Sequence, residues 1–318
     1  MYKEKRLSRS EFVPIRGLNY HVLMWDAPSD APSGLPPLVL LHGWMDVAAS
    51  YQFMVDAFSD ALMTGRTIIA PDWRGFGLTT VTGSTNQPDN YWFPDYLADL
   101  DFLLDHYAQA QPVDLVGHSM GGNVAMIYAG IRPERIHKLV NLEGFGMPAS
   151  QPTQAPARYV KWMNELKSLH RGEMDLKAYG NVAGVARRLM KTNPRLTEDK
   201  AHWLASHWAR PDSAGNWSIL GNPAHKITSA NLYRADETLA IYQCITAPTL
   251  AVEASDDSLL KWHKGDYTLA QYHERMKAVS KAEIAVIEDA GHMLHHDQPE
   301  LLAQLIEDFL NKGHLKFV

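Results

Sequence analysis

Short apolar runs alternate with longer amphipathic stretches through the first half of the sequence, and this alternation constrains the fold most. Four runs are apolar along almost their whole length: 38–41, 67–70, 113–116 and 138–142. Continuous apolarity is typical of strands that are buried on both faces of a parallel sheet. Apolar residues recur at helical spacing in the stretches between them, 50–63, 96–109 and 121–131. The pattern predicts an α/β fold with a mostly parallel central sheet and helices on both of its faces.

The pattern changes after residue 147. The next segment is Pro-rich at its start, then helical and Trp-rich, and it shows no run typical of a buried strand. Strand patterns return at 248–252 and 283–287, before an amphipathic helix at 299–310. We therefore predict a helical cap inserted between two core strands, with the boundaries 1–147 for the first part of the core, 148–236 for the cap and 237–318 for the second part of the core.

Composition limits the function classes. The chain carries 36 acidic and 30 basic side chains, a net charge of −6, which argues against a nucleic acid or an anionic membrane as partner. The expected partner is a small molecule, and the expected assembly is a monomer or a homodimer. The single cysteine, Cys244, excludes an internal disulfide and is interpreted as a small core residue. The polar N-terminus, with no apolar signal-peptide segment behind it, predicts a cytoplasmic location.

The segment Gly117-His118-Ser119-Met120-Gly121 follows one predicted strand and precedes a predicted helix. A Gly-x-Ser-x-Gly sequence in that context is typical of a nucleophile elbow, a sharp turn that lifts the serine hydroxyl clear of the sheet. Glycines flank the serine because side chains at those positions would collide with neighbouring backbone. Ser119 is therefore the predicted nucleophile.

The segment His42-Gly43-Trp44 follows the apolar run 38–41. A glycine after the strand permits a tight turn, so that the backbone N–H of Trp44 faces the nucleophile. The backbone N–H of Met120, directly after Ser119, is the second predicted donor of an oxyanion hole.

Several tryptophans are candidates for a substrate pocket. They are Trp44, Trp162, Trp203 and Trp208. Aromatic side chains at helical spacing also commonly serve packing, so both interpretations stay open for each of them.

The predicted general base is His292. It lies just beyond the strand pattern 283–287, next to Gly291 and ahead of a helix that starts near Pro299. A histidine on a loop at a strand end is placed to reach a nucleophile that is distant in the sequence.

The neighbouring His295, His296 and Asp297 suggest a metal cluster at first sight. No second group of ligands at metal-binding spacing accompanies them in the sequence. We interpret them as a solvated loop and helix cap, and the sequence predicts neither a metal site nor a cofactor.

Taken together, these motifs resemble the α/β-hydrolase superfamily, and especially its capped serine-hydrolase-like members. The resemblance extends from about residue 12 to the C-terminal helix. It rests on the segments 42–44, 72–77, 117–121, 291–299 and, more weakly, 188–198 of the cap.

The resemblance implies a third member of a catalytic triad, a carboxylate that orients the histidine. Asp257 follows the strand 248–252, where the superfamily usually carries its acid. Glu143 ends the strand 138–142, where the haloalkane-dehalogenase branch carries its acid instead. Ala254 departs from the glycine usual before the acidic turn, which weakens the first assignment. The sequence favours Asp257 and keeps Glu143 as the alternative.

The expected reaction is ester hydrolysis by a carboxylesterase-like enzyme on a small, apolar substrate, through an acyl-enzyme on Ser119. Two alternatives remain open. A carbon–carbon bond hydrolase would use the same triad on a diketone and would need a basic cap residue, for which Arg187 or Arg188 is a candidate. A protein that kept the fold but lost turnover would only bind its ligand.

Overall fold

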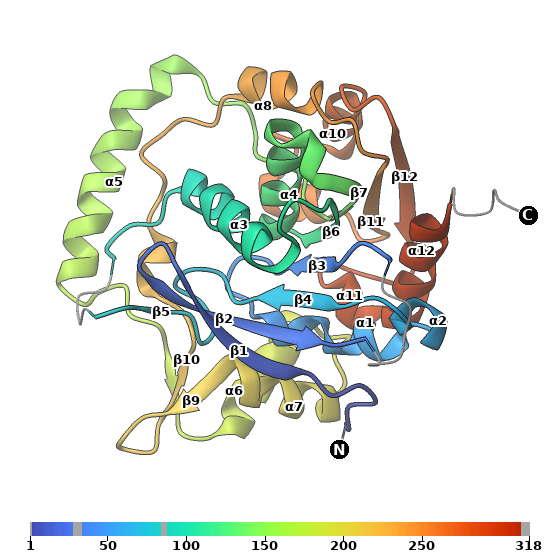
Figure 1. Cartoon of the computed structure of the whole chain (residues 1–318). Helices are drawn as coiled ribbons and strands as arrows, with labels where there is room; N and C mark the ends of the chain where they lie inside the picture. The colour runs from blue at the N-terminus through green and yellow to red at the C-terminus, as the bar shows by residue number, and fades with distance from the viewer. Residues whose placement is uncertain (1, 28–33, 84–87, 313–318) are drawn as a thin grey trace, which may run out of the picture.

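A computed structural model describes residues 2–27, 34–83 and 88–312 (Figure 1). Within these ranges nine strands form the main sheet, in the order β1-β2-β4-β3-β6-β7-β11-β12, with β5 paired to β2. The strands are β1 Arg9–Ile15, β2 Leu18–Trp25, β3 Leu38–Leu41, β4 Ile68–Pro71, β5 Thr80–Val81, β6 Val113–His118, β7 Ile136–Leu142, β11 Thr249–Ala254 and β12 Ala282–Ile287. The strands from β4 to β12 in this order are parallel, which confirms the predicted mostly parallel central sheet.

Helices cover both faces of this sheet, and one apolar cluster lies beneath each layer. On one face lie α3 Phe93–Ala108, α4 Met120–Ile131, α8 Ala235–Tyr242 and α10 Leu269–Met276. On the other face lie α1 Gln52–Ala57, α2 Asp60–Met63, α11 Leu294–Asp297 and α12 Pro299–Asn311. Short 3-10 turns occur at Ala48–Tyr51 and Pro133–Arg135, and α9 spans Ser258–His263.

One core helix and one core residue differ from the sequence prediction. The stretch 50–63, predicted as one helix, divides into a 3-10 turn, α1 and α2, because Phe58 and Ser59 are extended between the helices. Ser59 then accepts a hydrogen bond from the N–H of Leu62 and caps α2. Cys244, interpreted as a core residue, is exposed, because it follows the end of α8 at the surface.

The inserted segment contains three helices and a small sheet. The helices are α5 Ala155–His170, α6 Val182–Thr192 and α7 Glu198–Trp208, with 3-10 turns at Pro152–Gln154 and Pro223–Lys226. The strands β8 Ala178–Tyr179, β9 Ala209–Pro211 and β10 Trp217–Ile219 form an antiparallel sheet. The sequence prediction missed these strands because they are only two or three residues long and none is buried along its length.

The inserted segment, for which we keep the name cap, packs unevenly on the core. Helices α6 and α7 share an apolar cluster that includes Phe53 of α1, whereas α5 has no fully buried residue and lies along one side of the molecule (Figure 1). No helix in the described part of the chain is both long and apolar enough to cross a lipid bilayer.

Candidate active site

The parallel strands bring the predicted site residues to one edge of the sheet. Trp44, Ser119, Glu143, Asp257 and His292 each follow the carboxyl end of a strand, namely β3, β6, β7, β11 and β12. Carboxyl ends of parallel strands meet at the same edge, which is where open α/β sheets bind their ligands.

Ser119 occupies a sharp turn between β6 and α4. Its φ is +51°, an unfavourable value for a residue with a side chain, and its N–H donates to the carbonyl of Leu142 at 2.8 Å. A Cβ at Gly117 would lie 2.3 Å from the carbonyl oxygen of Gly121, and a Cβ at Gly121 would lie 2.1 Å from that of Leu41. The turn therefore requires both glycines, as the Gly-x-Ser-x-Gly sequence predicted.

Gly43 lies directly beside this turn. A Cβ at Gly43 would come within 3.3 Å of the Ser119 Cβ. The structure records no intramolecular acceptor, within the described residues, for the backbone N–H of either Trp44 or Met120. Met120 is the first residue of α4, whose N-terminal amides have no partner inside the helix. This arrangement suits two donors to a developing oxyanion.

His292 lies on the loop between β12 and α11, next to the nucleophile turn. Its carbonyl oxygen is 2.7 Å from Nε2 of His118, and the two imidazole rings are 4.7 Å apart. Its own ring is nearly perpendicular to that of Trp262 of α9, with the ring centroids 4.3 Å apart. Among the described residues no hydrogen bond joins the Ser119 hydroxyl to His292, and hydrogen bonds of an active site are often long in a structure without substrate.

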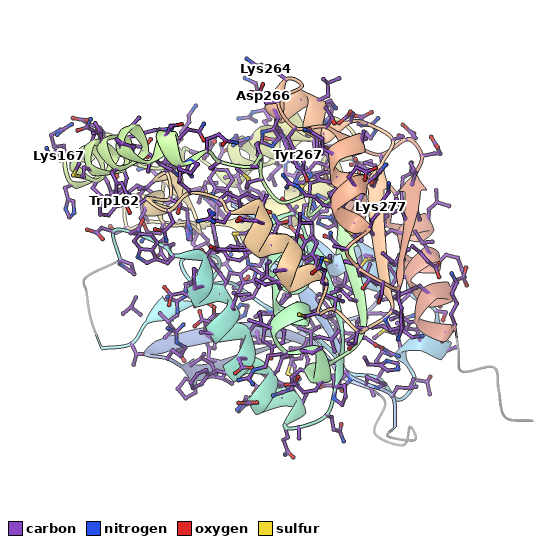
Figure 2. All side chains as sticks on the ribbon, turned by 90° about the horizontal axis from the view of Figure 1, so that it is seen from above. Trp162, Lys167, Lys264, Asp266, Tyr267 and Lys277 are labelled. Carbon is purple, nitrogen blue, oxygen red and sulfur yellow. The ribbon has the colours of Figure 1, made fainter. Side chains whose placement is uncertain are left out.

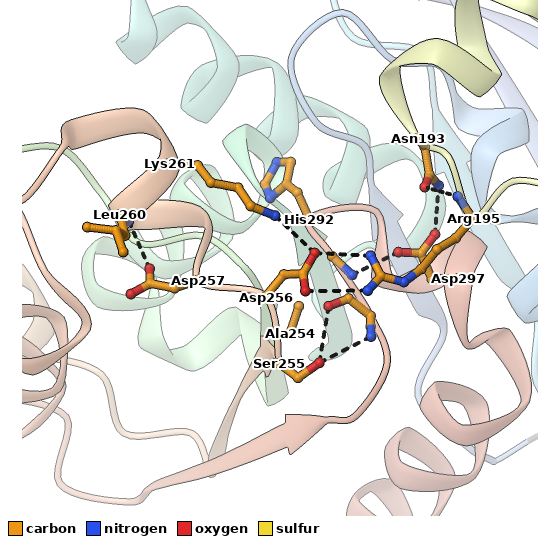
Figure 3. A network of polar contacts seen from close by, with 12 residues as sticks. Asn193, Arg195, Ala254, Ser255, Asp256, Asp257, Leu260, Lys261, His292 and Asp297 are labelled. Carbon is orange, nitrogen blue, oxygen red and sulfur yellow. Dashed lines mark hydrogen bonds and ion pairs between the residues drawn. The ribbon is translucent and has the colours of Figure 1, made fainter.

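The carboxylate next to His292 belongs to Glu143, the alternative acid of the sequence analysis, and not to Asp257. Glu143 Oε2 lies 3.2 Å from His292 Nδ1, and Glu143 Oε1 accepts the N–H of Ala254 at 2.8 Å. Asp257 instead caps α9, where its carboxylate accepts the N–H of Leu260 at 2.8 Å (Figure 3). It caps the helix because the turn after β11 ends in a helix start, which needs an acceptor at this position.

Burial shifts the pKa of both partners. Burial raises the pKa of Glu143 to about 7, although the hydrogen bond from Ala254 opposes this shift. Burial lowers the pKa of His292 to about 3. The imidazole is therefore neutral near neutral pH, which is the form that accepts a proton from a serine.

A polar network joins the cap to the loop that carries His292 (Figure 3). Asp297 accepts the N–H of Gly291 at 2.9 Å with one oxygen and the side-chain amide of Asn193 at 2.7 Å with the other. Arg195, two residues further along the cap, forms an ion pair with Asp256 at 3.0 Å. Asp297 thus links the cap to the backbone next to His292, a connection that the sequence analysis missed because Asn193 and Asp297 are about 100 residues apart.

The four predicted pocket tryptophans lie in different surroundings. Trp44 is 52% exposed, and its indole donates to the carbonyl of His225 in the cap at 3.2 Å. Trp203 packs against Tyr2 and Phe53. Trp208 donates to Asp46 at 3.1 Å, so Trp203 and Trp208 serve packing between cap and core.

Trp162 lines an open groove of about 580 Å³ along α5, together with neighbouring side chains such as Met163 and Leu166. Figure 2 shows Trp162 and Lys167 on this helix. None of Ser119, Glu143 and His292 lines the groove. Trp262, which the sequence analysis did not single out, contacts the candidate base more directly than Trp162 does.

His295 and His296 were predicted to be solvated, and this prediction is wrong. Their exposed fractions are 0% and 4%, because α11 turns both rings inward against α1 and the end of β6. Burial lowers the pKa of His295 well below its usual value, and burial raises the pKa of the nearby Asp46 to about 7. These buried polar groups lie next to the nucleophile turn.

The fold and this edge of the sheet define the class of protein. A sequence profile described as the alpha/beta hydrolase fold matches residues 36–299, and the chain belongs to this family.

Similar proteins come from organisms as different as a fish and a bacterium. A serine hydrolase-like protein of Danio rerio is 27% identical over 88% of this chain and 82% of its own length. A 2-hydroxymuconate semialdehyde hydrolase of Pseudomonas sp. (strain CF600) is 24% identical over 88% of each chain. Among solved structures, a thioesterase domain from the curacin biosynthetic pathway superposes with a TM-score of 0.77 at 22% identity, over 95% of this chain and 99% of that domain. Hydrolases thus recur among the relatives, and the structural similarity supports the fold.

Proposed function

We propose that this protein is a serine hydrolase that cleaves an ester-type bond of a small, apolar substrate. Ser119 is the nucleophile, His292 the general base, and Glu143 the carboxylate that orients and stabilises the imidazole. The N–H groups of Trp44 and Met120 form the oxyanion hole.

The reaction takes two steps. His292 removes the proton of the Ser119 hydroxyl, and the oxygen attacks the substrate carbonyl. The negative charge on the carbonyl oxygen is stabilised by the two backbone donors and by the N-terminal end of α4. The protonated His292 then gives its proton to the leaving alcohol, which departs and leaves an acyl group on Ser119. Water, activated by His292, releases the acid and restores the serine.

The observation that carries this proposal is the backbone of Ser119. A positive φ at a serine costs free energy, of the order of 1–3 kcal/mol, and such strain is concentrated at functional sites. The strained residue faces Gly43 and adjoins the segment of His292, which is paired with a carboxylate. Epoxide or halide chemistry by attack of a carboxylate on carbon would need an aspartate at this position. The serine found there supports acyl transfer instead.

A fluorophosphonate probe tests the nucleophile. We expect one probe per chain, attached at Ser119, and no labelling of the Ser119→Ala variant at equal folded fraction. Turnover of p-nitrophenyl esters of increasing acyl length would then show which acyl group fits. Absence of labelling in the folded wild-type protein would favour a ligand-binding protein without turnover.

A carbon–carbon bond hydrolase is the second candidate, because one similar protein is a 2-hydroxymuconate semialdehyde hydrolase. The basic residues suggested for a substrate carboxylate, Arg187 and Arg188, are both exposed on α6, and Arg188 donates to Thr192. The exposure of both arginines favours an ester over a diketone with a carboxylate group as the substrate. Parallel assays with p-nitrophenyl esters and with vinylogous diketones distinguish the two reactions.

A further inference from the structure

Beneath the nucleophile turn, three side chains from distant segments converge in the interior. Asp46 follows the turn after β3, His118 ends β6, and His295 lies in α11. Their exposed fractions are 3%, 1% and 0%. One ligand-type atom from each lies within 4.8 Å of the other two. The proposed hydrolysis uses none of these atoms.

Each of the three side chains has a buried polar atom with no hydrogen-bond partner among the described residues. Asp46 Oδ1 accepts hydrogen bonds from the N–H of Val47, the Ser50 hydroxyl and the Trp208 indole, whereas its Oδ2 has no partner among the described residues. That Oδ2 lies 3.9 Å from His295 Nε2, too far for a hydrogen bond. Neither ring nitrogen of His295 has a hydrogen-bond partner in the described part of the chain.

The hydrogen bond of His118 leaves one of its nitrogens free to act as a ligand. Its Nε2 contacts the carbonyl of His292, which can only accept, so Nε2 carries the proton and Nδ1 carries a lone pair. That Nδ1 is buried and has no partner among the described residues. A histidine that donates one N–H to a carbonyl while its other nitrogen is free has the arrangement found in metal-binding histidines.

Buried polar atoms without a partner destabilise the fold, so a ligand that pairs with one such atom on each of the three side chains would stabilise it. We propose that Asp46, His118 and His295 bind one divalent transition-metal ion, with zinc as the best match. Two imidazoles and one carboxylate suit Zn²⁺ or Co²⁺, whereas Mg²⁺ and Ca²⁺ prefer oxygen ligands alone.

Metal binding requires the three side chains to move closer together. Zinc bonds of about 2.0–2.2 Å put tetrahedral ligand atoms about 3.4 Å apart. The 3.9 Å between Asp46 Oδ2 and His295 Nε2 is close to this value, whereas the separations to His118, which are at most 4.8 Å, have to shorten by up to about 1.4 Å through side-chain rotation. A fourth ligand, such as water, would complete the coordination.

The position of the site gives it a structural role. His118 precedes Ser119 in the chain and donates a hydrogen bond to the carbonyl of His292. A bound ion would therefore tie together the segments after β3, after β6 and after β12, which carry Trp44, Ser119 and His292.

Cobalt binding tests the site without measuring hydrolysis, so the outcome is independent of the proposed function. Metal-free protein is titrated with Co²⁺, and the visible absorption typical of four-coordinate cobalt is recorded. We expect one Co²⁺ per chain, displacement by Zn²⁺ but not by Mg²⁺, and a higher Tm in the presence of Zn²⁺ because the ion binds the folded state.

Two variants locate the site. Asp46→Asn and His295→Gln should each lower the affinity for Co²⁺ at least tenfold and abolish the rise in Tm. His296→Gln is the matched control, because His296 is equally buried and its Nε2 also lacks a partner among the described residues, yet it is outside the ligand set. This control should retain the wild-type spectrum and affinity.

If His295→Gln does not fold, Asp46→Asn still tests the site, since asparagine preserves the shape of the side chain and can direct its amide toward His295. Failure of the folded wild-type protein to bind Co²⁺ in a one-to-one ratio would overturn the proposal. So would binding that persists in Asp46→Asn, and either result would leave a buried water or a proton as the partner of these atoms.

Discussion

Glu143 Oε2 lies 3.2 Å from His292 Nδ1, although the two residues follow strands that are separated in the sheet by β11. The other oxygen of Glu143 bridges this intervening strand by accepting the N–H of Ala254 at its end. Glu143 has a positive φ of +55° directly after β7, so the chain turns sharply at the carboxylate itself. One side chain thus links three strand ends at the candidate active site.

Exchange of Glu143 for glutamine should lower kcat by about 10³–10⁴-fold with little change in KM, because the imidazole loses the partner that sets its tautomer and stabilises its charge. The matched variant is Asp257→Asn, which retains the cap of α9, since asparagine is also a good capping residue. Steady-state kinetics should find Asp257→Asn within a few-fold of wild type. The opposite pattern would return the role of triad acid to Asp257.

The pH dependence of kcat/KM should follow the ionisation of Glu143, whose pKa burial raises to about 7. Below this pH the carboxyl is neutral and no longer stabilises a protonated His292, so activity should increase as pH rises through about 7 and then level off. A profile measured in chelator-treated buffer that is flat between pH 5 and 8 would contradict this assignment.

The raised pKa of Glu143 also predicts that stability falls as pH rises, whereas activity increases. The folded state favours the protonated carboxyl, since the ordinary pKa of glutamate is about 4.3. The contribution of Glu143 to stability is therefore complete below its unfolded pKa and is lost as pH rises through about 7. Urea unfolding across this range should show a smaller loss of stability with rising pH in Glu143→Gln than in the wild-type protein.

Gly121→Ala should destabilise the protein by about 3 kcal/mol or more, because the added Cβ would lie 2.1 Å from the carbonyl oxygen of Leu41 and only a backbone shift relieves that clash. Gly180→Ala is the control: a Cβ there meets nothing within 4 Å, and we expect a change below about 1 kcal/mol. Urea unfolding curves of both variants measure the difference. Equal stability of the two variants would mean that the turn between β6 and α4 tolerates a side chain.

Asp297→Ala should lower kcat at least tenfold while the protein remains folded, because the loop of His292 loses the acceptor for the N–H of Gly291 and its connection to Asn193. Arg195→Ala removes only partly exposed ion pairs with Asp256 and Asp289, each of the kind worth about 0–1 kcal/mol, so its effect on kcat should stay within about threefold. Turnover of a p-nitrophenyl ester, together with Tm, separates a loss of positioning from a loss of folding. A kcat of Asp297→Ala equal to that of Arg195→Ala would show that Asp297 does not position the loop.

The strand and helix order of the core was predictable, since buried parallel strands and amphipathic helices leave strong periodic patterns. The Ser119 turn was predictable for a similar reason: its geometry depends on five consecutive residues, and two glycines are needed to avoid backbone collisions. The short strands of the cap were not, because two or three half-exposed residues carry no such pattern.

The candidate active site was also predictable only in part. The sequence by itself determined which loops follow the strands, and therefore placed Ser119 and His292 at one edge of the sheet. Only the tertiary structure decided that Glu143 rather than Asp257 faces His292, because that choice depends on which of two strand-end loops turns inward.

The burial of His295 beside Asp46 and His118 was likewise decided by tertiary packing. These three residues are separated by more than 70 positions each, and no local spacing rule connects them. A sequence records which side chains are near in the chain, whereas strand order and helix packing decide which of them share the interior.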